Sequence, residues 1–260
     1  MSEPTDKTNP DRKFLAKEAL SDLVGLLRQD GYTVVGPVQV DGVILLRPIE
    51  SAEELARGVR DEQEGGRYRL VEGDPQLYFE YVVGPDSPKR YFFPPEKKLF
   101  SLTVKGQEYH IDQREPEPPR LAFIGLRACE LAAIGVQDRV FGLGEDQSPY
   151  RCEADHYYVR ARQQALLIAV DCNRPAATCF CDSMDTGPAV TEGHDLALTE
   201  LHEGFLVRAG TERGSALAEK LPTRKPTEAE LELEEARHEV SRGLLKRQLE
   251  TEGLKESIDR

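Results

Sequence analysis

The sequence predicts an α/β or α+β protein in which helices flank a mixed sheet and a long charged helix follows. The middle of the chain alternates the two kinds of element, with expected strands at 121–124 and 166–170 and expected helices at 131–140 and 154–162. Strand pairs are expected on either side of this core. A chain of 260 residues can bury a sizeable core. We expect three regions: a disordered N-terminus over 1–12, an α/β domain over 13–222, and a charged helical connector over 223–260.

The N-terminal part is expected to form a helix and then a hairpin. Apolar residues recur at helical spacing from Phe14 to Leu27, and Asp30-Gly31 would end the helix. The runs 32–37 and 43–46 predict two strands, joined at Asp41-Gly42 because this pair favours a tight hairpin turn. Ser51 followed by Glu54 predicts a capped helical turn.

The remaining flanking elements are less regular. We expect a charged loop over 57–69 and strands over 77–83 and 99–104, separated by an aromatic Pro-Pro turn at 91–95. After the core, a closing hairpin is expected at 195–201 and 204–208, with a short helix over 215–221. From 227 to about 252 the chain is rich in Glu, Leu, Lys and Arg, which indicates an extended, solvent-exposed helix. The alternative is a helix that packs back on the core.

Charge and hydropathy exclude some partners. The net charge of -13 argues against nonspecific binding to nucleic acid or to an anionic membrane. No apolar run approaches the ~20 residues of a transmembrane helix. The chain opens with polar residues and no apolar signal-peptide core, so we expect a cytoplasmic protein that docks to other proteins.

Three of the five cysteines lie within ten residues. Cys172, Cys179 and Cys181 directly follow the apolar run 165–170, which places thiol groups at the end of a buried strand. In a cytoplasmic protein this spacing favours a metal or an iron-sulfur cluster over a disulfide. The best fourth ligand is Cys129, which follows another strand and a turn at Gly125 and would lie near a helix start that favours a thiolate.

The two strand-end loops can meet at one edge of the sheet, where α/β folds place their sites. The fifth cysteine, Cys152, lies in a polar segment and is expected to be a free thiol.

Two other kinds of site fit cysteines. A structural zinc site in an interaction module would use four cysteines, but zinc favours pairs two to four residues apart, whereas here there is a six-residue gap and a Cys-x-Cys step. A thiol enzyme with Cys129 or Cys179 as nucleophile would need a nearby base. The histidines are scattered along the sequence, at His110, His156, His194, His202 and His238.

Several motifs, in order, resemble a known family. They are Gly84-Pro85, 93–95, 125–134, 138–141, Cys172 to Pro175, Cys179 to Pro188, and 195–201. Over roughly residues 40–255 the chain resembles the iron-sulfur electron-transfer protein shared by cytosolic sulfhydrogenases (as their beta subunit) and anaerobic sulfite reductases (as their A-type subunit), a family of 4Fe-4S dicluster-domain proteins. The Cys-Phe-Cys block with its trailing Gly-Pro is the specific part.

The resemblance implies a non-catalytic subunit that relays electrons between a flavin-containing, NAD(P)H-oxidising subunit and a catalytic hydrogenase or sulfite-reductase subunit. It also implies one [4Fe-4S] cluster, held by residues that match family cysteines: Cys129, Cys172, Cys179 and Cys181. Cys152 has no counterpart. The family usually continues into a ferredoxin-like region with Cys-x-x-Cys runs, which is not matched before Arg260, so the charged helix is expected to be the connector to it.

Four polar residues near the cysteines would support such a cluster. Arg127 and Arg174 flank the cysteines and could offset the negative charge of a tetrathiolate cluster, although surface ion pairing with nearby acids is the commoner role. The hydroxyls of Ser183 and Thr186 are expected to donate hydrogen bonds towards sulfur, and such bonds tune the reduction potential.

Overall fold

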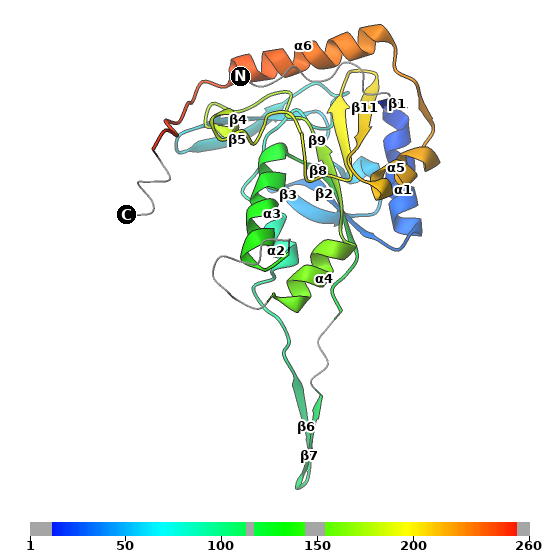
Figure 1. Ribbon diagram of the computed structural model, residues 1–260, viewed down its shortest axis with the longest axis vertical. Helices are drawn as coiled ribbons and strands as arrows, with labels where there is room; N and C mark the ends of the chain where they lie inside the picture. Colours follow the sequence, from blue (N-terminus) through cyan, green and yellow to red (C-terminus); the bar gives the residue numbers. More distant parts are fainter. Residues whose placement is uncertain (1–11, 113–116, 144–153, 254–260) are drawn as a thin grey trace.

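An eight-stranded mixed sheet forms the centre of the protein in a computed structural model that describes residues 12–112, 117–143 and 154–253 (Figure 1). Its strand order is β12-β1-β11-β10-β9-β8-β2-β3. The parallel centre consists of β2 (Thr33–Val40), β8 (Leu121–Leu126), β9 (Leu166–Val170) and β10 (Leu196–Glu200). The antiparallel edges are β3 (Val43–Ile49) on one side and β11 (Gly204–Ala209), β1 (Lys13–Ala16) and β12 (Thr223–Arg224) on the other. The predicted α/β class is confirmed.

Helices cover both faces of the sheet because the central strands are apolar on both sides. One face packs against α1 (Leu20–Gln29) and α5 (Glu212–Lys220), and the other against α2 (Lys89–Phe92), α3 (Ala128–Val140) and α4 (His156–Gln164). Successive strand residues alternate between the layers: Ile124 and Ile168 lie in the first core, and Phe123 and Leu167 in the second. The helices predicted in the middle of the chain are therefore present as α3 and α4, which cover one face of the sheet, while α1 and α5 cover the other.

The start of the chain differs from the prediction. Phe14 and Leu15 belong to β1, which pairs with β11 and β12, and the helix begins only at Leu20, after a 3₁₀ turn η1 (Lys17–Ala19). The apolar side chains of Phe14 and Leu15 fit a helical spacing. Their backbone nevertheless forms a strand, because it pairs with the edge of β11. The predicted hairpin is confirmed, with Asp41 and Gly42 both at positive φ in its turn.

The segment 57–83 also differs. The expected charged loop is a hairpin, β4 (Val59–Glu64) and β5 (Arg67–Glu72), and the expected strand at 77–83 is irregular chain. Carboxylates replace a strand partner there: Glu200 accepts hydrogen bonds from the backbone N–H groups of Tyr78 (2.7 Å) and Phe79 (2.9 Å), and Asp61 accepts one from Val82 (2.8 Å). Buried acids therefore fix this segment over the sheet.

One predicted turn is confirmed, and the strand expected at 99–104 is present as β6, although its partner β7 was not foreseen. Ser51 and Glu54 form the expected capping box at η2 (Ala52–Glu54). β6 (Ser101–Lys105) and β7 (Glu108–Asp112) form a two-stranded ribbon that projects from the body (Figure 1).

The C-terminal helix α6 (Glu228–Leu244) lies against the core. Glu234 and Ser241 are buried on its inner face, which corresponds to the packed alternative and not to the extended, solvent-exposed helix. Within the described ranges, none of the helices combines the length and the apolar character needed to cross a lipid bilayer.

Candidate metal centre

Four cysteines meet at the carboxyl edge of the parallel sheet. Cys129 lies in the first turn of α3, directly after β8, and Cys172 lies two residues after β9. Because β8 and β9 are parallel neighbours, their following loops emerge at the same edge. Cys179 and Cys181 come from the loop after Cys172, and all four side chains line one cavity of about 110 Å³.

The rest of this cavity is mainly apolar. Val82, Val83, Ala128 and Pro188 form much of its wall, together with Gly187, Gln63 and Arg127. The cysteines are the only thiol, imidazole or carboxylate groups among its lining residues in the described part of the chain. An all-sulfur donor set of this kind selects zinc or an iron-sulfur cluster and disfavours magnesium or calcium.

The distances between the cysteine sulfurs distinguish a zinc ion from an iron-sulfur cluster as the occupant of this cavity. A tetrahedral zinc ion with Zn–S bonds of ~2.3 Å holds its sulfurs about 3.8 Å apart. Among the described residues, the only trio whose ligand atoms all lie within 4.8 Å of one another is Asp171, Glu234 and His238, so no three cysteine sulfurs are that close. A cluster accommodates wider spacing because each thiolate binds a different iron.

Burial keeps these thiols protonated in the absence of a cation. Burial and the neighbouring Glu130 raise the pKa of Cys129 to about 12, although its side chain is the most exposed of the four. Burial likewise raises the pKa of Cys172 to about 11 and raises those of Cys179 and Cys181. The expectation that the helix start favours a Cys129 thiolate is therefore wrong for the thiol itself, and a metal would have to displace its proton.

Arg127 is a buried cation in the cavity wall. Its side chain is 3% exposed, and its guanidinium donates hydrogen bonds to the backbone carbonyls of Asp171 (3.1 Å), Phe79 (2.9 Å) and Tyr81 (2.6 Å). The charge of Arg127 lowers the thiol pKa values of Cys172 and Cys179, against the effect of burial. Arg127 therefore joins three segments around the cavity and carries the positive charge expected beside thiolates.

The other three predicted supporting residues lie off the cavity. Arg174 forms an ion pair with Glu80 at 3.7 Å, the commoner role considered for it. The Thr186 hydroxyl donates to the Cys181 carbonyl (3.3 Å), and the Ser183 hydroxyl accepts from the backbone N–H of Leu249 (3.0 Å). Hydrogen bonds from these hydroxyls to sulfur remain a prediction.

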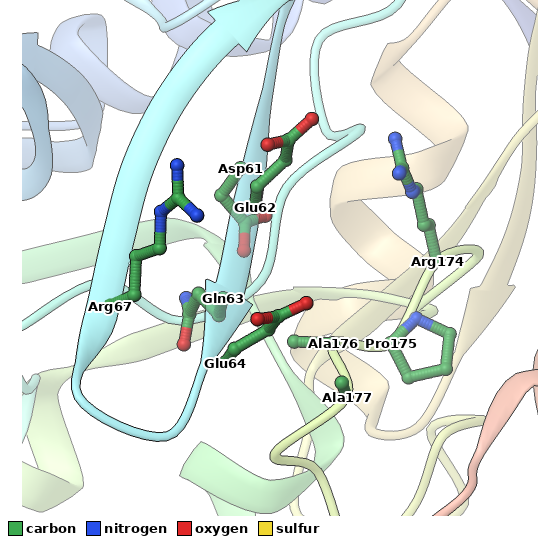
Figure 2. A pocket seen from close by; sticks show the side chains of 9 residues that line it. All are labelled: Asp61, Glu62, Gln63, Glu64, Arg67, Arg174, Pro175, Ala176 and Ala177. Carbon is green, nitrogen blue, oxygen red and sulfur yellow. The ribbon is translucent and has the colours of Figure 1, made fainter.

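A second, polar cavity of about 350 Å³ adjoins the first. The β4–β5 hairpin forms one wall and the turn from Arg174 to Ala177 the other, and Gln63 lines both cavities. Figure 2 shows Arg67 on the hairpin side and Arg174 on the loop side, with Glu62 and Glu64 between them. The cysteine loop thus separates an apolar cavity from a charged one.

A buried charge network lies directly behind Cys172. Asp171 is 1% exposed and contacts Arg208 (3.0 Å) and His238 (3.0 Å), while Arg208 also pairs with Glu234. Burial by itself would raise the pKa of Asp171, but the charge of Arg208 and the hydrogen bonds from His238 and Thr199 hold it below its usual range. The trio Asp171, Glu234 and His238 therefore already has a counter-ion in Arg208.

Helix α6 and the segment after it contact the loop that carries Cys172, Cys179 and Cys181. The Ser241 hydroxyl donates to the carbonyl of Cys172, and the Leu249 N–H reaches Ser183, two residues beyond Cys181. Sequence reasoning missed these contacts. The available signal was that Glu234, His238 and Ser241 lie four and three residues apart, so they share one face of the helix.

The thiol-enzyme hypothesis finds no base in this geometry. None of the five histidines lines the cysteine cavity, and His238, in the network behind Cys172, contacts Asp171 instead. Cys152 lies outside the described residues, so its expected role as a free thiol stays a prediction.

Gly187 offers a local test of the cavity's dimensions. A Cβ at this position would lie 3.2 Å from the Cys181 sulfur, and the glycine has φ of +152°, which disfavours other residues. We expect Gly187→Ala to lower the metal bound per chain at least about twofold, because it displaces Cys181 and metal sites require accurately placed ligands. The control is Gly135→Ala in α3, where a Cβ meets nothing within 4 Å. Equal metal content in the two variants would contradict this view of the cavity.

Comparison with known proteins finds a similarity to a hydrogenase subunit. The chain is similar to sulfhydrogenase 2 subunit beta of Pyrococcus furiosus, with 28% identity over 148 residues. The matched region covers 57% of this chain and 40% of that protein, so the chain spans less than half of its relative's length. This similarity supports a relationship between the chain and the family of that hydrogenase subunit. No family model and no solved structure matches the chain.

Proposed function

We propose that this protein is a cytoplasmic, non-catalytic electron-transfer subunit that holds one [4Fe-4S] cluster on Cys129, Cys172, Cys179 and Cys181. The observation that carries the proposal is the convergence of these four thiols, from the loops after two adjacent parallel strands, on one mainly apolar cavity. The similarity to a protein named as a sulfhydrogenase beta subunit supports the same class of function.

The residues that line the cavity fit a [4Fe-4S] cluster. The donor set is all sulfur, the sulfurs are more widely spaced than one zinc ion requires, and Arg127 supplies a buried positive charge beside them. When bound, such a cluster takes up and releases one electron. The chain's own part is to hold the four sulfurs, to exclude water with Val82, Val83 and Pro188, and to offset negative charge with Arg127.

The partners belong to the proposal as well. The resemblance of the motifs to the sulfhydrogenase and sulfite-reductase family implies that the electrons pass between a flavin-containing, NAD(P)H-oxidising subunit and a catalytic subunit of the hydrogenase or sulfite-reductase type. The relative is itself named as a subunit of a sulfhydrogenase. The cavity lies at the edge of the sheet, with Cys129 exposed, so that a partner's redox group can approach it without crossing the core.

Substitution of one ligand tests the site. Cys179→Ser replaces a soft thiolate by a hydroxyl, so we expect the anaerobically purified variant to lose most of its iron, acid-labile sulfide and broad absorbance near ~400 nm. The matched control is Cys152→Ser, which should keep the wild-type iron content because Cys152 has no counterpart in the family's ligand pattern. Loss of iron in both variants, or in neither, would contradict the assignment. A wild-type protein that carries about one zinc would instead support the structural zinc module.

A further inference from the structure

The β6–β7 ribbon, residues 101–112, has one apolar and one polar face. In its antiparallel register Leu102 lies opposite Ile111, and Val104 lies opposite Tyr109. Residues directly opposite each other in a ladder share a face, so these four side chains form one continuous apolar surface. The other face carries only polar or charged residues: Ser101, Thr103, Lys105, Glu108, His110 and Asp112.

The apolar face is uncovered. Tyr109 is 73% exposed and Val104 is 61% exposed, and the ribbon points away from the sheet and its helices (Figure 1). Leu99 and Phe100, at the base of the ribbon, are 67% and 58% exposed. An isolated two-stranded hairpin is marginally stable in water, and clustered exposed apolar side chains mark an interaction surface. The ribbon therefore needs something to pack against.

A second copy of the same chain fits this surface. An isologous contact requires a patch that is complementary to itself, and a ribbon face made only of apolar side chains can meet a second copy of itself about a twofold axis. The six side chains, four on the ribbon face and two at its base, are each 45% to 73% exposed. They supply apolar area for an interface, of which each partner buries roughly 800 Å² in a standard case.

Charge permits this occupant at the ribbon and opposes it elsewhere on the surface. The whole chain carries a net charge of -13, so two copies repel each other over most of their surfaces. Residues 96–112 contain three basic and three acidic residues and thus no net charge: Lys97, Lys98 and Lys105 against Glu96, Glu108 and Asp112. Because the ribbon projects, it can pair while the acidic bodies stay apart.

We propose that two copies of this chain form a homodimer by packing the apolar faces of their β6–β7 ribbons against each other. This inference is independent of the cluster and of the electron-transfer role.

Sedimentation velocity on the purified full chain at about 1 to 100 µM, a range that brackets typical dissociation constants, tests the proposal. Wild-type protein is expected to sediment with twice the monomer mass of 29.1 kDa. The double variant Val104→Lys with Tyr109→Lys should associate at least about 100-fold more weakly, because it places like charges across the interface. The matched control, Thr103→Lys with His110→Lys, adds the same charge to the polar face and should remain a dimer.

Each outcome of the sedimentation experiment either supports or overturns the proposed homodimer. Both double variants leave the body of the protein untouched, so far-UV circular dichroism should show wild-type folding in each. A wild-type monomer across the whole range would overturn the proposal. So would a dimer that survives the apolar-face substitutions, since another surface would then hold it together. Equal dissociation of both double variants would show a general charge effect and would also overturn it.

Discussion

Asp171→Ala is expected to lower the free energy of unfolding by about 3–5 kcal/mol, the usual cost of removing one partner from a buried ion pair. The loss leaves Glu234 as the one carboxylate paired with the buried cation Arg208 among the described residues, and it removes the hydrogen bond between His238 and Asp171. It also removes the acceptor for the backbone N–H of Val190, at 2.7 Å. Denaturant unfolding followed by far-UV circular dichroism measures the change.

The control for this experiment lies on the outer face of α6, the helix whose residues Glu234 and His238 belong to the network. Glu239 is exposed on α6, so Glu239→Ala should stay within about 0.5 kcal/mol of the wild-type stability. If Asp171→Ala were no less stable than Glu239→Ala, the buried network would not be what fastens α6 to the core.

Arg127→Met is expected to have the second large effect. Methionine preserves much of the side-chain volume but leaves the carbonyls of Phe79, Tyr81 and Asp171 without their donor, at about 1–3 kcal/mol for each buried group left unpaired. It also removes the cation beside the thiolates. We therefore expect both a destabilised protein and a marked loss of bound iron, measured by unfolding and by metal analysis on the same preparation.

Two further variants separate charge from hydrogen bonding at this position. Arg127→Lys keeps the charge but lacks the fork that reaches several carbonyls at once, so it should fall between wild type and Arg127→Met in both measurements. Arg174→Met removes an arginine whose pair with Glu80 is part-exposed, and should cost less than about 1 kcal/mol. Wild-type stability and iron content in Arg127→Met would contradict the role given to this residue.

The central strands were predictable because their local sequence patterns agree with their burial in the sheet. The runs at β8 and β9 are apolar and bounded by turns, and both are central strands buried on two sides. Asp41-Gly42 predicted a hairpin that the register confirms. The shared edge for Cys129 and Cys172 followed from these strands being parallel neighbours, a pairing that the sequence pattern suggested.

The misjudged segments are those whose partners lie far away in the sequence. Leu15 fits a helical spacing, yet its strand exists because β11 has a free edge. The chain around Tyr78 has the composition of a strand, but Glu200, more than a hundred residues later, takes its backbone N–H groups. For the same reason Val82 and Val83 were not foreseen as cavity lining, since no local pattern places an irregular segment beside Cys129.

The two arginines near the cysteines also differ because of contacts with a segment that is distant in the sequence. Arg127 and Arg174 are alike in sequence, since each lies two residues from a cysteine. Burial distinguishes them: Arg127 is enclosed by three carbonyls, whereas Arg174 reaches out to Glu80. That difference depends on the fold of 77–83 and could not be read from spacing.

The most direct test of the central claim is the iron and acid-labile sulfide content of the wild-type protein purified without oxygen. The proposed site predicts about four irons and about four sulfides per chain, as one [4Fe-4S] cluster requires. About one zinc with no sulfide, or no metal at all under these conditions, would contradict the electron-transfer function proposed for the four cysteines.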